Sequence, residues 1–291
     1  MNIFITGING YLGSELAKEL RNIGISVSGC DIIGPFDSDV HHSDIRSKNI
    51  LKIMPNRVDV IIHLAALSSD KLCRNNEYDC FDLNVMGTLN IMHCAELKNC
   101  KQLIFSSSEW VYENSDDHLI NNEKTLIDPF LIKSEYALSK LTSELIMKQK
   151  YSQSSFDITI LRFGIIYGGG RKSGSAVESI VNQILKKDIL EIGSKKTGRY
   201  FIHYKDIISG IISSIDFNGF NIFNLAGDEF IELGKIIQIT LEKIKKNIKV
   251  IEKNKSEHSR RMVSNKSAKN LLKWKPQIKI EQGIDEILSH Y

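Results

Sequence analysis

Short apolar runs alternate with amphipathic stretches along the first half of the chain. The runs are rich in β-branched and aromatic residues and predict buried strands at residues 2–6, 25–31, 58–64, 102–106 and 157–162. Between them, apolar residues recur at helical spacing and predict helices at residues 11–22, 81–98 and 135–150. Strands that alternate with helices indicate a parallel sheet covered on both faces. We therefore expect an α/β fold with a doubly wound, parallel Rossmann sheet.

The pattern changes after Tyr167. A glycine-rich stretch at residues 168–174 predicts a flexible loop, and short strands then mix with helices predicted at residues 175–187, 233–246 and 280–288. This mixture predicts a second, smaller α/β domain. We expect the first domain to span residues 1–166, with residues 200–225 returning to it, and the second to consist mainly of residues 167–291.

Composition and charge exclude several classes of function. The 291 residues include 38 Lys and Arg against 35 Asp and Glu, for a net charge of +3. A charge so balanced gives no strong basic field, so we expect no nucleic-acid partner. No apolar stretch reaches the ~18–20 residues of a membrane span, and we see no basic leader, so we expect no membrane partner and no signal peptide.

The five cysteines are scattered and form no C-x-x-C pair. This pattern predicts reduced thiols and a cytoplasmic location rather than a disulfide framework. Metal-ligand spacing is absent, so we expect no metal site, and we expect His41-His42 to lie in a solvated loop.

Three glycines, Gly7, Gly10 and Gly13, follow the first predicted strand and open the first predicted helix. Glycines let the backbone turn sharply and approach a pyrophosphate, whose charge lies at the helix N-terminus. The G-x-x-G-x-x-G loop therefore predicts a dinucleotide site, although a plain strand–turn–helix also favours glycine. We expect the cofactor to be lined by the loop, including Asn9, Tyr11 and Leu12.

Asp31 ends the second predicted strand, about 20 residues after the glycines. A carboxylate there binds the adenosine ribose hydroxyls and repels a 2′-phosphate, which favours NAD over NADP. The alternative is a turn cap. Asp44 and Ile45 follow in a predicted turn and are weaker candidates to border the adenine.

Tyr136 and Lys140 lie one helical turn apart on the same predicted face. They follow a strand that ends in Ser106-Ser-Ser108, and hydroxyls at such a strand end face the cofactor crevice of this fold. A phenol is a poor base at neutral pH, and a neighbouring ammonium lowers its pKa. We therefore expect Tyr136 to act as a base, with Ser108 holding the substrate oxygen.

Taken together, these residues resemble the extended short-chain dehydrogenase/reductase family, and in particular its nucleotide-sugar epimerases and dehydratases. The matching motifs run in order along nearly the whole chain. They comprise Thr6-Gly-x-x-Gly-x-x-Gly13, Asp31, His63-Leu-Ala-Ala66, Asn84-Val-x-Gly87-Thr88, Ser106-Ser-Ser108, Tyr136-x-x-x-Lys140, Leu161-Arg-Phe-x-x-x-Tyr-Gly168, Arg199-x-Phe-Ile-His203-x-x-Asp206, Phe223-Asn-Leu-Ala-Gly227 and Lys273-Trp-Lys-Pro276.

The resemblance implies an NAD-binding Rossmann domain, a substrate-binding C-terminal domain and transient oxidation of a sugar carbon by bound NAD. It makes Tyr136 the general base, Lys140 its tuning residue and a nicotinamide-ribose ligand, and Ser108 the substrate-hydroxyl ligand. It also places Leu64, Ala65 and Ala66 along the cofactor and assigns Arg199 and Arg261 to the substrate diphosphate, a task that suits the arginine fork. For Arg199 the alternative is an ion pair with Asp206.

The sequence also departs from the family pattern. Where dehydratases place an acid pair after the serine, this chain has Glu109 and Trp110. Glu109 is a candidate substrate-binding residue and keeps 4,6-dehydration as an alternative activity. The aromatic ring of Trp110 argues against that activity. Glu113 replaces a glycine that usually follows Val-Tyr.

We expect from this resemblance an NAD-dependent nucleotide-sugar epimerase, acting at C4, in the synthesis of polysaccharide precursors. A nucleotide-4-ketosugar reductase, a 4,6-dehydratase and a non-catalytic NAD(P)-binding module remain alternatives. Relatives often dimerise by pairing helices equivalent to residues 81–98 and 135–150, so a homodimer is a further hypothesis. The nucleobase, the sugar and the reacting carbon cannot be read from the residues themselves.

Overall fold

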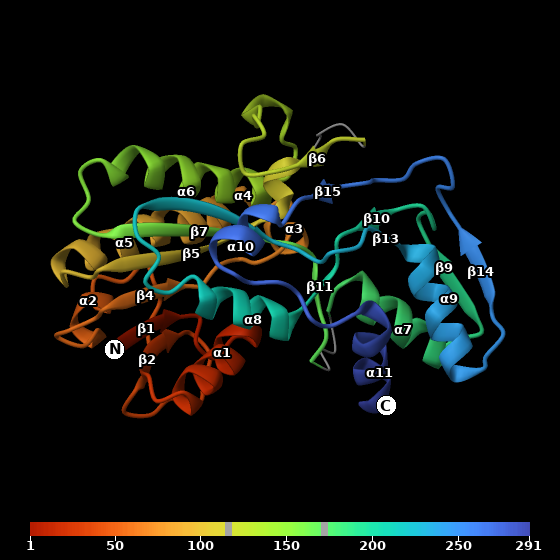
Figure 1. The fold of residues 1–291 in the computed structure, drawn as a ribbon, viewed down its shortest axis with the longest axis horizontal. Coiled ribbons are helices and arrows are strands. Elements are labelled where there is room, and N and C mark those ends of the chain that lie inside the picture. Colours follow the sequence, from red (N-terminus) through yellow and green to blue (C-terminus); the bar gives the residue numbers. More distant parts are fainter. Residues whose placement is uncertain (114–117, 170–173) are drawn as a thin grey trace. The chain divides into compact units, whose positions relative to one another are not determined.

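The computed structural model describes residues 1–113, 118–169 and 174–291. The expected α/β fold is confirmed: seven strands form one parallel sheet in the order β12-β7-β5-β4-β1-β2-β3 (Figure 1). The strands are β1 (Asn2–Thr6), β2 (Ser26–Asp31), β3 (Val40–His42), β4 (Val60–His63), β5 (Gln102–Ser108), β7 (Asp157–Phe163) and β12 (Phe220–Leu225). The order turns at β1 and β4, where the carboxyl ends of neighbouring strands leave a crevice for a ligand.

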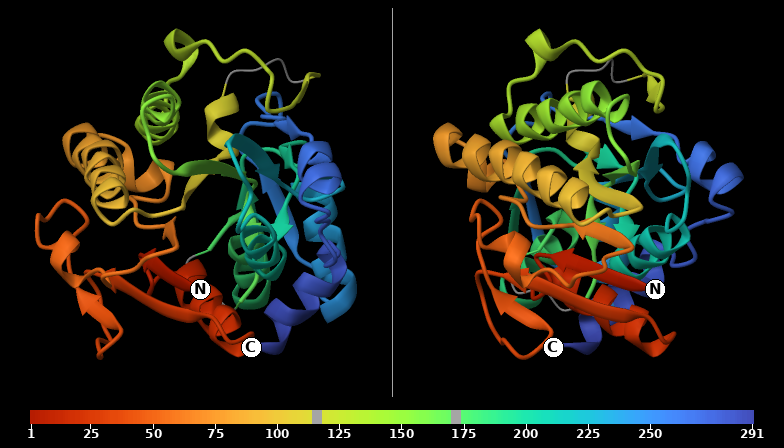
Figure 2. Two further views of the ribbon diagram at one scale, coloured as in Figure 1. Left: turned by 60° about the vertical axis from the view of Figure 1, so that its left-hand side comes forward. Right: turned by 90° about the vertical axis from the view of Figure 1, so that its left-hand side faces the viewer.

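Helices cover both faces of this sheet (Figure 2). On one face lie α5 (Gly87–Leu97) and α6 (Glu135–Tyr151), whose Ile91 and Met147 join strand residues in one buried apolar cluster. On the other face lies α1 (Tyr11–Asn22), which buries Leu16 and Leu20. Short helices connect the strands, namely α2 (Ile50–Ile53), α3 (Asp70–Cys73), α4 (Glu77–Phe81), a π-helix η1 (Asp82–Met86) and the 3-10 helices η2 (Glu109–Tyr112) and η3 (Pro129–Leu131).

The chain divides into two compact units. The first consists of Met1–Glu113, Leu126–Arg162 and Ile211–Phe223. The second consists of Asn114–Thr125, Phe163–Gly210 and Asn224–Tyr291. Thus only residues 211–223 of the expected returning segment 200–225 belong to the first unit, and a segment around β6 (Ile120–Asn121) belongs to the second.

The second unit packs helices on small two-stranded sheets. Its core joins α7 (Ala176–Lys186), α9 (Leu233–Ile244) and α11 (Ile280–Ser289) through buried isoleucines such as Ile180, Ile236 and Ile284. Its remaining elements are β8 (Ile166–Tyr167), β9 (Ile189–Ile192), β10 (Gly198–Arg199), β11 (Ile202–His203), α8 (Tyr204–Ser213, which crosses into the first unit), β13 (Ile231–Glu232), β14 (Lys249–Glu252), β15 (Met262–Val263) and α10 (Lys266–Leu271).

Three sequence expectations need correction. His41 and His42 lie in the edge strand β3 rather than in a loop, because Cys30 and Asp31 of β2 pair with them. The helix expected at residues 81–98 is divided, since the π-helix η1 separates α4 from α5. The cysteines are not all reduced, because a disulfide joins Cys73 and Cys80.

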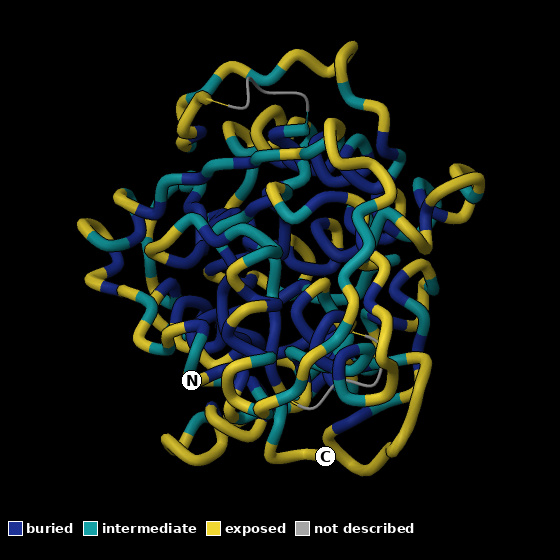
Figure 3. Tube along the Cα trace, turned by 90° about the vertical axis from the view of Figure 1, so that its right-hand side faces the viewer, coloured by how far each residue is buried: buried dark blue, intermediate teal, exposed yellow. Residues whose placement is uncertain are grey.

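Buried positions gather in the interior of the trace, and most turns are exposed (Figure 3). The loop expected at residues 168–174 falls partly outside the described residues. Among the described helices, none is both long and apolar enough to cross a membrane.

Candidate active site

The glycine loop joins the end of β1 to the start of α1. Gly7 has φ +73° and its backbone lies so close to the strand end after β4 that an added Cβ would meet the Ala65 amide nitrogen at 2.9 Å. A Cβ at Gly13 would meet the Gly7 carbonyl oxygen at 2.1 Å, so helix and loop need glycine there. Gly10 is the N-cap residue of α1 and brings no side-chain cap, which leaves the helix N-terminus suited to an anion.

The residues expected to line the cofactor around this loop lie close together. The Asp31 carboxylate accepts hydrogen bonds from the Asn9 amide at 3.0 Å and from the Ile32 and Ile33 amides at 2.8 and 3.1 Å. The Ala65 amide donates to Thr6 Oγ1 at 3.2 Å, which holds the segment Leu64–Ala66 beside the loop. Loop, carboxylate and β4 end therefore form one cradle at the carboxyl ends of β1, β2 and β4.

Asp44 and Ile45 differ in their surroundings: the Asp44 side chain forms an ion pair, and the Ile45 side chain is buried. Asp44 pairs with Arg46 at 2.5 Å, and this hydrogen bond lowers the pKa of the Asp44 carboxyl below its usual range. Arg46 also pairs with Asp82 at 2.6 Å. The Ile45 side chain is buried in the core against Gly87, so only its backbone is available to border an adenine.

The three expected catalytic residues lie on β5 and α6. Ser108 ends β5 and caps the 3-10 helix η2, accepting from the Trp110 amide at 3.3 Å. Tyr136 is the second residue of α6, whose N-cap Ser134 accepts from the Ala137 amide at 3.3 Å. Tyr136 forms a hydrogen bond with Ser108, and both side chains are buried, at 7% and 6% exposure. The structure therefore brings the expected base and the expected substrate ligand together.

The electrostatics of Tyr136 differ from the sequence expectation. Burial raises the pKa of the Tyr136 phenol to about 12, and the Ser108 hydrogen bond offsets only part of this effect. Lys140 donates to the Ser106 carbonyl at 2.7 Å and lies over the Phe105 ring, 4.7 Å from its centroid. The Lys140 ammonium is thus held at the end of β5.

Lys140 itself is unusual. Burial lowers the pKa of its ammonium to about 7, and the nearby carboxylate of Glu144 partly opposes this effect. A buried cation retained next to a buried phenol is typical of a functional site.

A buried hydrogen-bond network, which the sequence does not predict, holds α6 in place. The Glu144 carboxylate accepts from Ser107 Oγ at 2.5 Å and from Arg162 Nη2 at 2.5 Å, and Arg162 Nη1 donates to the Tyr112 hydroxyl at 2.7 Å. Glu144 lies one turn after Lys140, so the network ties α6, the helix of Tyr136 and Lys140, to β5, β7 and η2. The sequence does not indicate this role of Glu144, because the residues that bind its carboxylate are distant in the sequence.

Glu113, which departs from the family pattern, also has a structural role. Its carboxylate accepts from the backbone amides of Lys133 at 3.1 Å and Ser134 at 2.9 Å. It thereby anchors the chain where α6 begins, two residues before Tyr136.

Glu109 and Trp110 follow Ser108 directly. Glu109 is fully buried, and Trp110 packs against a cluster formed by Tyr136, Cys73 and Cys80. An indole ring therefore stands beside the phenol, in a position where the dehydratase pattern would place an acid.

The two expected diphosphate ligands lie in the second unit and are brought together there. Arg199 Nη1 donates to the carbonyls of Gly198 and Ser259, both at 2.7 Å, and the Arg261 backbone amide donates to the same Gly198 carbonyl at 3.4 Å. The Asp206 carboxylate accepts from the amides of Gln277 at 2.9 Å and Ile278 at 3.0 Å, so these bonds serve the backbone rather than the alternative ion pair with Arg199.

Within the described parts of the chain, no cluster of three or more His, Cys, Asp or Glu could hold a metal ion. The glycine cradle, the uncapped start of α1 and Asp31 fit a dinucleotide, because they offer backbone amides to a pyrophosphate and a carboxylate to a ribose.

Comparisons with known proteins agree with this geometry. Residues 3–226 match the family described as the NAD dependent epimerase/dehydratase family. The UDP-glucuronate 4-epimerase of Thermodesulfobacterium geofontis is 25% identical over 303 residues, which cover 96% of this chain and 93% of that protein. The UDP-glucuronic acid decarboxylase 2 of Arabidopsis thaliana is 26% identical over 298 residues, covering 98% of this chain and 66% of that protein.

Solved structures show the same fold. The UDP-glucuronic acid 4-epimerase from Bacillus cereus, in complex with UDP-glucuronic acid and NAD, superimposes with a TM-score of 0.86 at 23% identity. The match covers 100% of both chains.

Proposed function

Because the chain belongs to the NAD dependent epimerase/dehydratase family, we propose that it is an NAD-dependent nucleotide-sugar 4-epimerase. The family makes it an NAD-dependent enzyme. The observation that carries the choice of an epimerase is the buried hydrogen bond between Ser108 and Tyr136, with Lys140 one turn further along α6. These groups can move a proton to and from a sugar hydroxyl, and an epimerase needs no further acid.

In this proposal the first unit binds the cofactor. Gly7, Gly10 and Gly13 approach the pyrophosphate together with Asn9, Tyr11 and Leu12, and Asp31 binds the adenosine ribose. Leu64, Ala65 and Ala66 line the cofactor, the backbone of Asp44 and Ile45 borders the adenine, and Lys140 binds the nicotinamide ribose. When bound, NAD supplies the hydride acceptor and returns the hydride to the sugar.

Tyr136 takes the proton of the sugar hydroxyl as general base, while Ser108 holds the oxygen from which it leaves. Their burial keeps water away from the reacting carbon. Burial raises the phenol pKa in the protein alone, and the positive charge of oxidised NAD would lower it. Binding of the oxidised cofactor would thus help Tyr136 to act as a base.

The second unit is proposed to bind the nucleotide through Arg199 and Arg261. The Arg199 guanidinium donates to two carbonyl oxygens and to the Ser259 hydroxyl, and these bonds orient its planar fork. A planar guanidinium fork suits a diphosphate. Because relatives and solved structures carry UDP-sugars in their names, a UDP-sugar, with UDP-glucuronate first, is the proposed substrate class.

A second candidate is a UDP-glucuronate decarboxylase, favoured by the Arabidopsis relative. Oxidation of a glucuronate at C4 creates a β-keto acid, which loses carbon dioxide readily. An epimerase must therefore return the hydride before carbon dioxide leaves. A 4,6-dehydratase through Glu109 and a ketosugar reductase have less support, because Trp110 occupies the place of the second acid and because the relatives named above are neither.

We also propose a homodimer and a cytoplasmic location, in the synthesis of polysaccharide precursors. The dimer hypothesis is supported by exposed apolar side chains on the two helices in question, Leu97 on α5 and Leu145 on α6, at 52% and 56% exposure. Light scattering at micromolar concentration tests it, and a monomer there would exclude it.

Proton NMR of the purified protein with UDP-glucuronate and UDP-glucose, without added cofactor, tests the activity. We expect the 4-epimer to accumulate to equilibrium, with no carbon dioxide released from UDP-[6-¹³C]glucuronate. Tyr136→Phe should lower turnover by about 100- to 10,000-fold and leave NADH binding intact, and Tyr151→Phe on the same helix is the matched control. Release of labelled carbon dioxide would establish the decarboxylase, and unchanged sugars with retained NAD would rule out both.

A further inference from the structure

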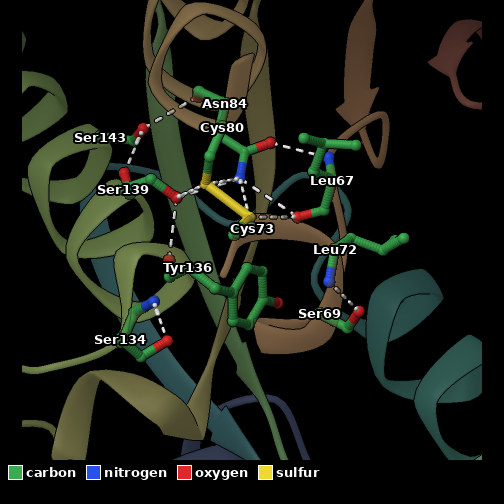
Figure 4. The surroundings of a disulfide bond; sticks show 11 residues. Leu67, Ser69, Leu72, Cys73, Cys80, Asn84, Ser134, Tyr136, Ser139 and Ser143 are labelled. Atoms are coloured by element: carbon green, nitrogen blue, oxygen red, sulfur yellow. Dashed lines mark hydrogen bonds between the residues drawn. A yellow bond between two sulfur atoms is a disulfide. The ribbon is translucent and has the colours of Figure 1, made fainter. Parts of the chain in front are cut away.

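A disulfide lies against the proposed catalytic tyrosine. Cys73 ends α3 and Cys80 lies in α4, with Cα atoms 5.2 Å apart, within the range of ordinary disulfides. Both cysteines are fully buried and form one apolar cluster with Tyr136 (Figure 4), and Leu67 and Trp110 pack against this cluster. The bridge is therefore part of the wall around the phenol.

Hydrogen bonds connect the bridge to the backbone of Tyr136. Asn84 Nδ2 lies 3.6 Å from Cys80 Sγ and donates to Ser139 Oγ at 3.0 Å. Ser139 Oγ in turn donates to the Tyr136 carbonyl at 2.8 Å (Figure 4). Three hydrogen bonds thus link the Cys80 sulfur to the Tyr136 carbonyl.

The same amide holds the segment before the bridge. Asn84 Oδ1 accepts from the Leu67 amide at 2.8 Å, and Asn84 Nδ2 lies 3.2 Å from the Leu67 carbonyl. Cys73 Sγ lies 3.7 Å from that carbonyl. Any movement of either sulfur must therefore change the partners of Asn84.

Breaking the bridge would force such a movement. Two thiols cannot remain at bonding distance and must part to van der Waals contact, and each brings a new S–H donor. The site is fully buried and close-packed, so the added volume must displace a neighbour. Candidates for displacement are the Tyr136 side chain, which packs in the same cluster as the cysteines, and the Asn84 amide, which contacts Cys80 Sγ.

The covering of the bridge is thin. It consists of α3, α4 and the turn between them, where Asn75 has φ +56°. Leu72 and Tyr78 are exposed by 52% and 80%, so one face of this segment meets solvent. Helices of four and five residues have few internal bonds, and their local opening would admit a small reductant.

We propose that Cys73 and Cys80 form a reversible thiol–disulfide site, at which a dithiol slows the enzyme by releasing Tyr136 from its position. The role assigned to Tyr136 rests on the proposed function. A thiolate of the dithiol attacks one sulfur and forms a mixed disulfide, and its second thiol resolves this bond. The dithiol leaves as a cyclic disulfide, and Cys73 and Cys80 gain two electrons and two protons. A disulfide-class oxidant reverses the exchange.

The test uses the purified full chain with bound NAD, before and after treatment with dithiothreitol. Alkylation under denaturing conditions should count three thiols before reduction, those of Cys30, Cys94 and Cys100, and five after it. We expect kcat to fall about tenfold, since a misplaced catalytic group costs up to ~100-fold, and to return after reoxidation. NADH affinity should stay constant, because the glycine cradle lies elsewhere in the unit.

Two variants separate the bridge from other thiols. Cys73→Ala/Cys80→Ala should have the activity of the reduced enzyme and ignore dithiothreitol, whereas Cys94→Ala should respond as the wild type does. If the double variant does not fold, the wild type in its two redox states carries the test alone. Unchanged kcat with five thiols exposed would overturn the proposal, as would five thiols in the oxidised protein.

A readout without turnover distinguishes this proposal from the proposed function. The absorbance titration of the Tyr136 phenol, taken as wild type minus Tyr136→Phe, should differ between the two redox states. Should no sugar react in either state while this titration still shifts, the proposed function fails and the redox site stands. An identical titration in both states would overturn the redox site.

Discussion

Lys140 points its ammonium at the backbone of Ser106, where Nζ donates to the carbonyl oxygen at 2.7 Å. This bond lies two residues before Ser108, so the lysine braces the end of β5 that carries the proposed substrate ligand.

The first prediction concerns the charge of the bound cofactor. Burial raises the pKa of the Tyr136 phenol to about 12, so the phenol stays protonated near neutral pH. Oxidised NAD carries a positive nicotinamide ring and NADH does not, so we expect the phenol pKa to be lower with NAD⁺ by more than about one unit, or ~1.4 kcal/mol. Difference absorbance of wild type minus Tyr136→Phe, with NAD⁺ or NADH bound, measures it. Equal pKa values in the two complexes would contradict the prediction.

The second prediction concerns the glycine loop. Gly7→Ala combines φ +73° with a Cβ only 2.9 Å from the Ala65 amide nitrogen, so the loop must shift away from the β4 end. We expect NADH affinity to fall about tenfold or more, or ~1.4 kcal/mol. Gly24→Ala is the matched control, because Gly24 has φ +81° but no atom within 4 Å of an added Cβ.

The control should lose about 1 kcal/mol of unfolding free energy and keep its NADH affinity. Fluorescence titration with NADH and urea unfolding measure the two effects. If both alanine variants bind NADH like the wild type, the crowding at Gly7 has no bearing on the cofactor.

The third prediction concerns the buried pair of Glu144 and Arg162, whose side chains are only 4% and 5% exposed. Arg162→Met leaves a carboxylate uncompensated in the interior and should lower the unfolding free energy by about 3–5 kcal/mol. Glu144→Gln/Arg162→Met removes both charges and should recover much of this loss. A double-mutant cycle from urea unfolding measures the coupling, and additive losses would show that the pair is not coupled.

The fourth prediction concerns acid stability. His63 is buried between Thr6 Oγ1 at 2.6 Å and Thr88 Oγ1 at 3.0 Å, and burial lowers its pKa from 6.5 to about 3. Below pH 6.5 the unfolded chain binds a proton that the folded chain does not. The unfolding free energy should therefore fall as pH drops from 6.5 towards 3, by up to ~1.4 kcal/mol per pH unit from this group.

His63→Gln should show a shallower pH dependence over this range, although it is less stable at pH 7 because two hydrogen bonds change. His93→Gln, on the exposed side of α5, is the control and should follow the wild type. Urea unfolding from pH 4.5 to 7.5 measures the slopes, and parallel curves for wild type and His63→Gln would show that His63 does not contribute.

The architecture could be predicted because its signals are local. β1 and α1 begin and end where the apolar pattern places them, at Asn2–Thr6 and Tyr11–Asn22. The strand β3 was not predicted, because an edge strand of three residues that includes two histidines has too short an apolar pattern to be recognised. The π-helix η1 was not predicted either, since an apolar periodicity of 3.6 residues does not reveal a single widened turn within a helix.

The sequence nominates residue types for the candidate site, but it does not reveal their contacts. The spacing of Tyr136 and Lys140 places them on one face, yet it cannot show that the ammonium binds Ser106 rather than the phenol. Glu113 and Cys73–Cys80 were missed because their partners are set by folding, and the spacing of the two cysteines matches no familiar motif.

One carbonyl oxygen sets the spacing of the glycine loop. Gly7 O accepts from the Gly10 amide at 3.0 Å, and a Cβ on Gly10 or Gly13 would approach it to 3.0 or 2.1 Å. The Gly7 carbonyl oxygen thus requires glycine at both Gly10 and Gly13, three residues apart. Inserting or deleting one residue between Gly10 and Gly13 would bring a side chain to that oxygen, so this loop should tolerate length changes far less well than substitutions at Ile8 or Leu12.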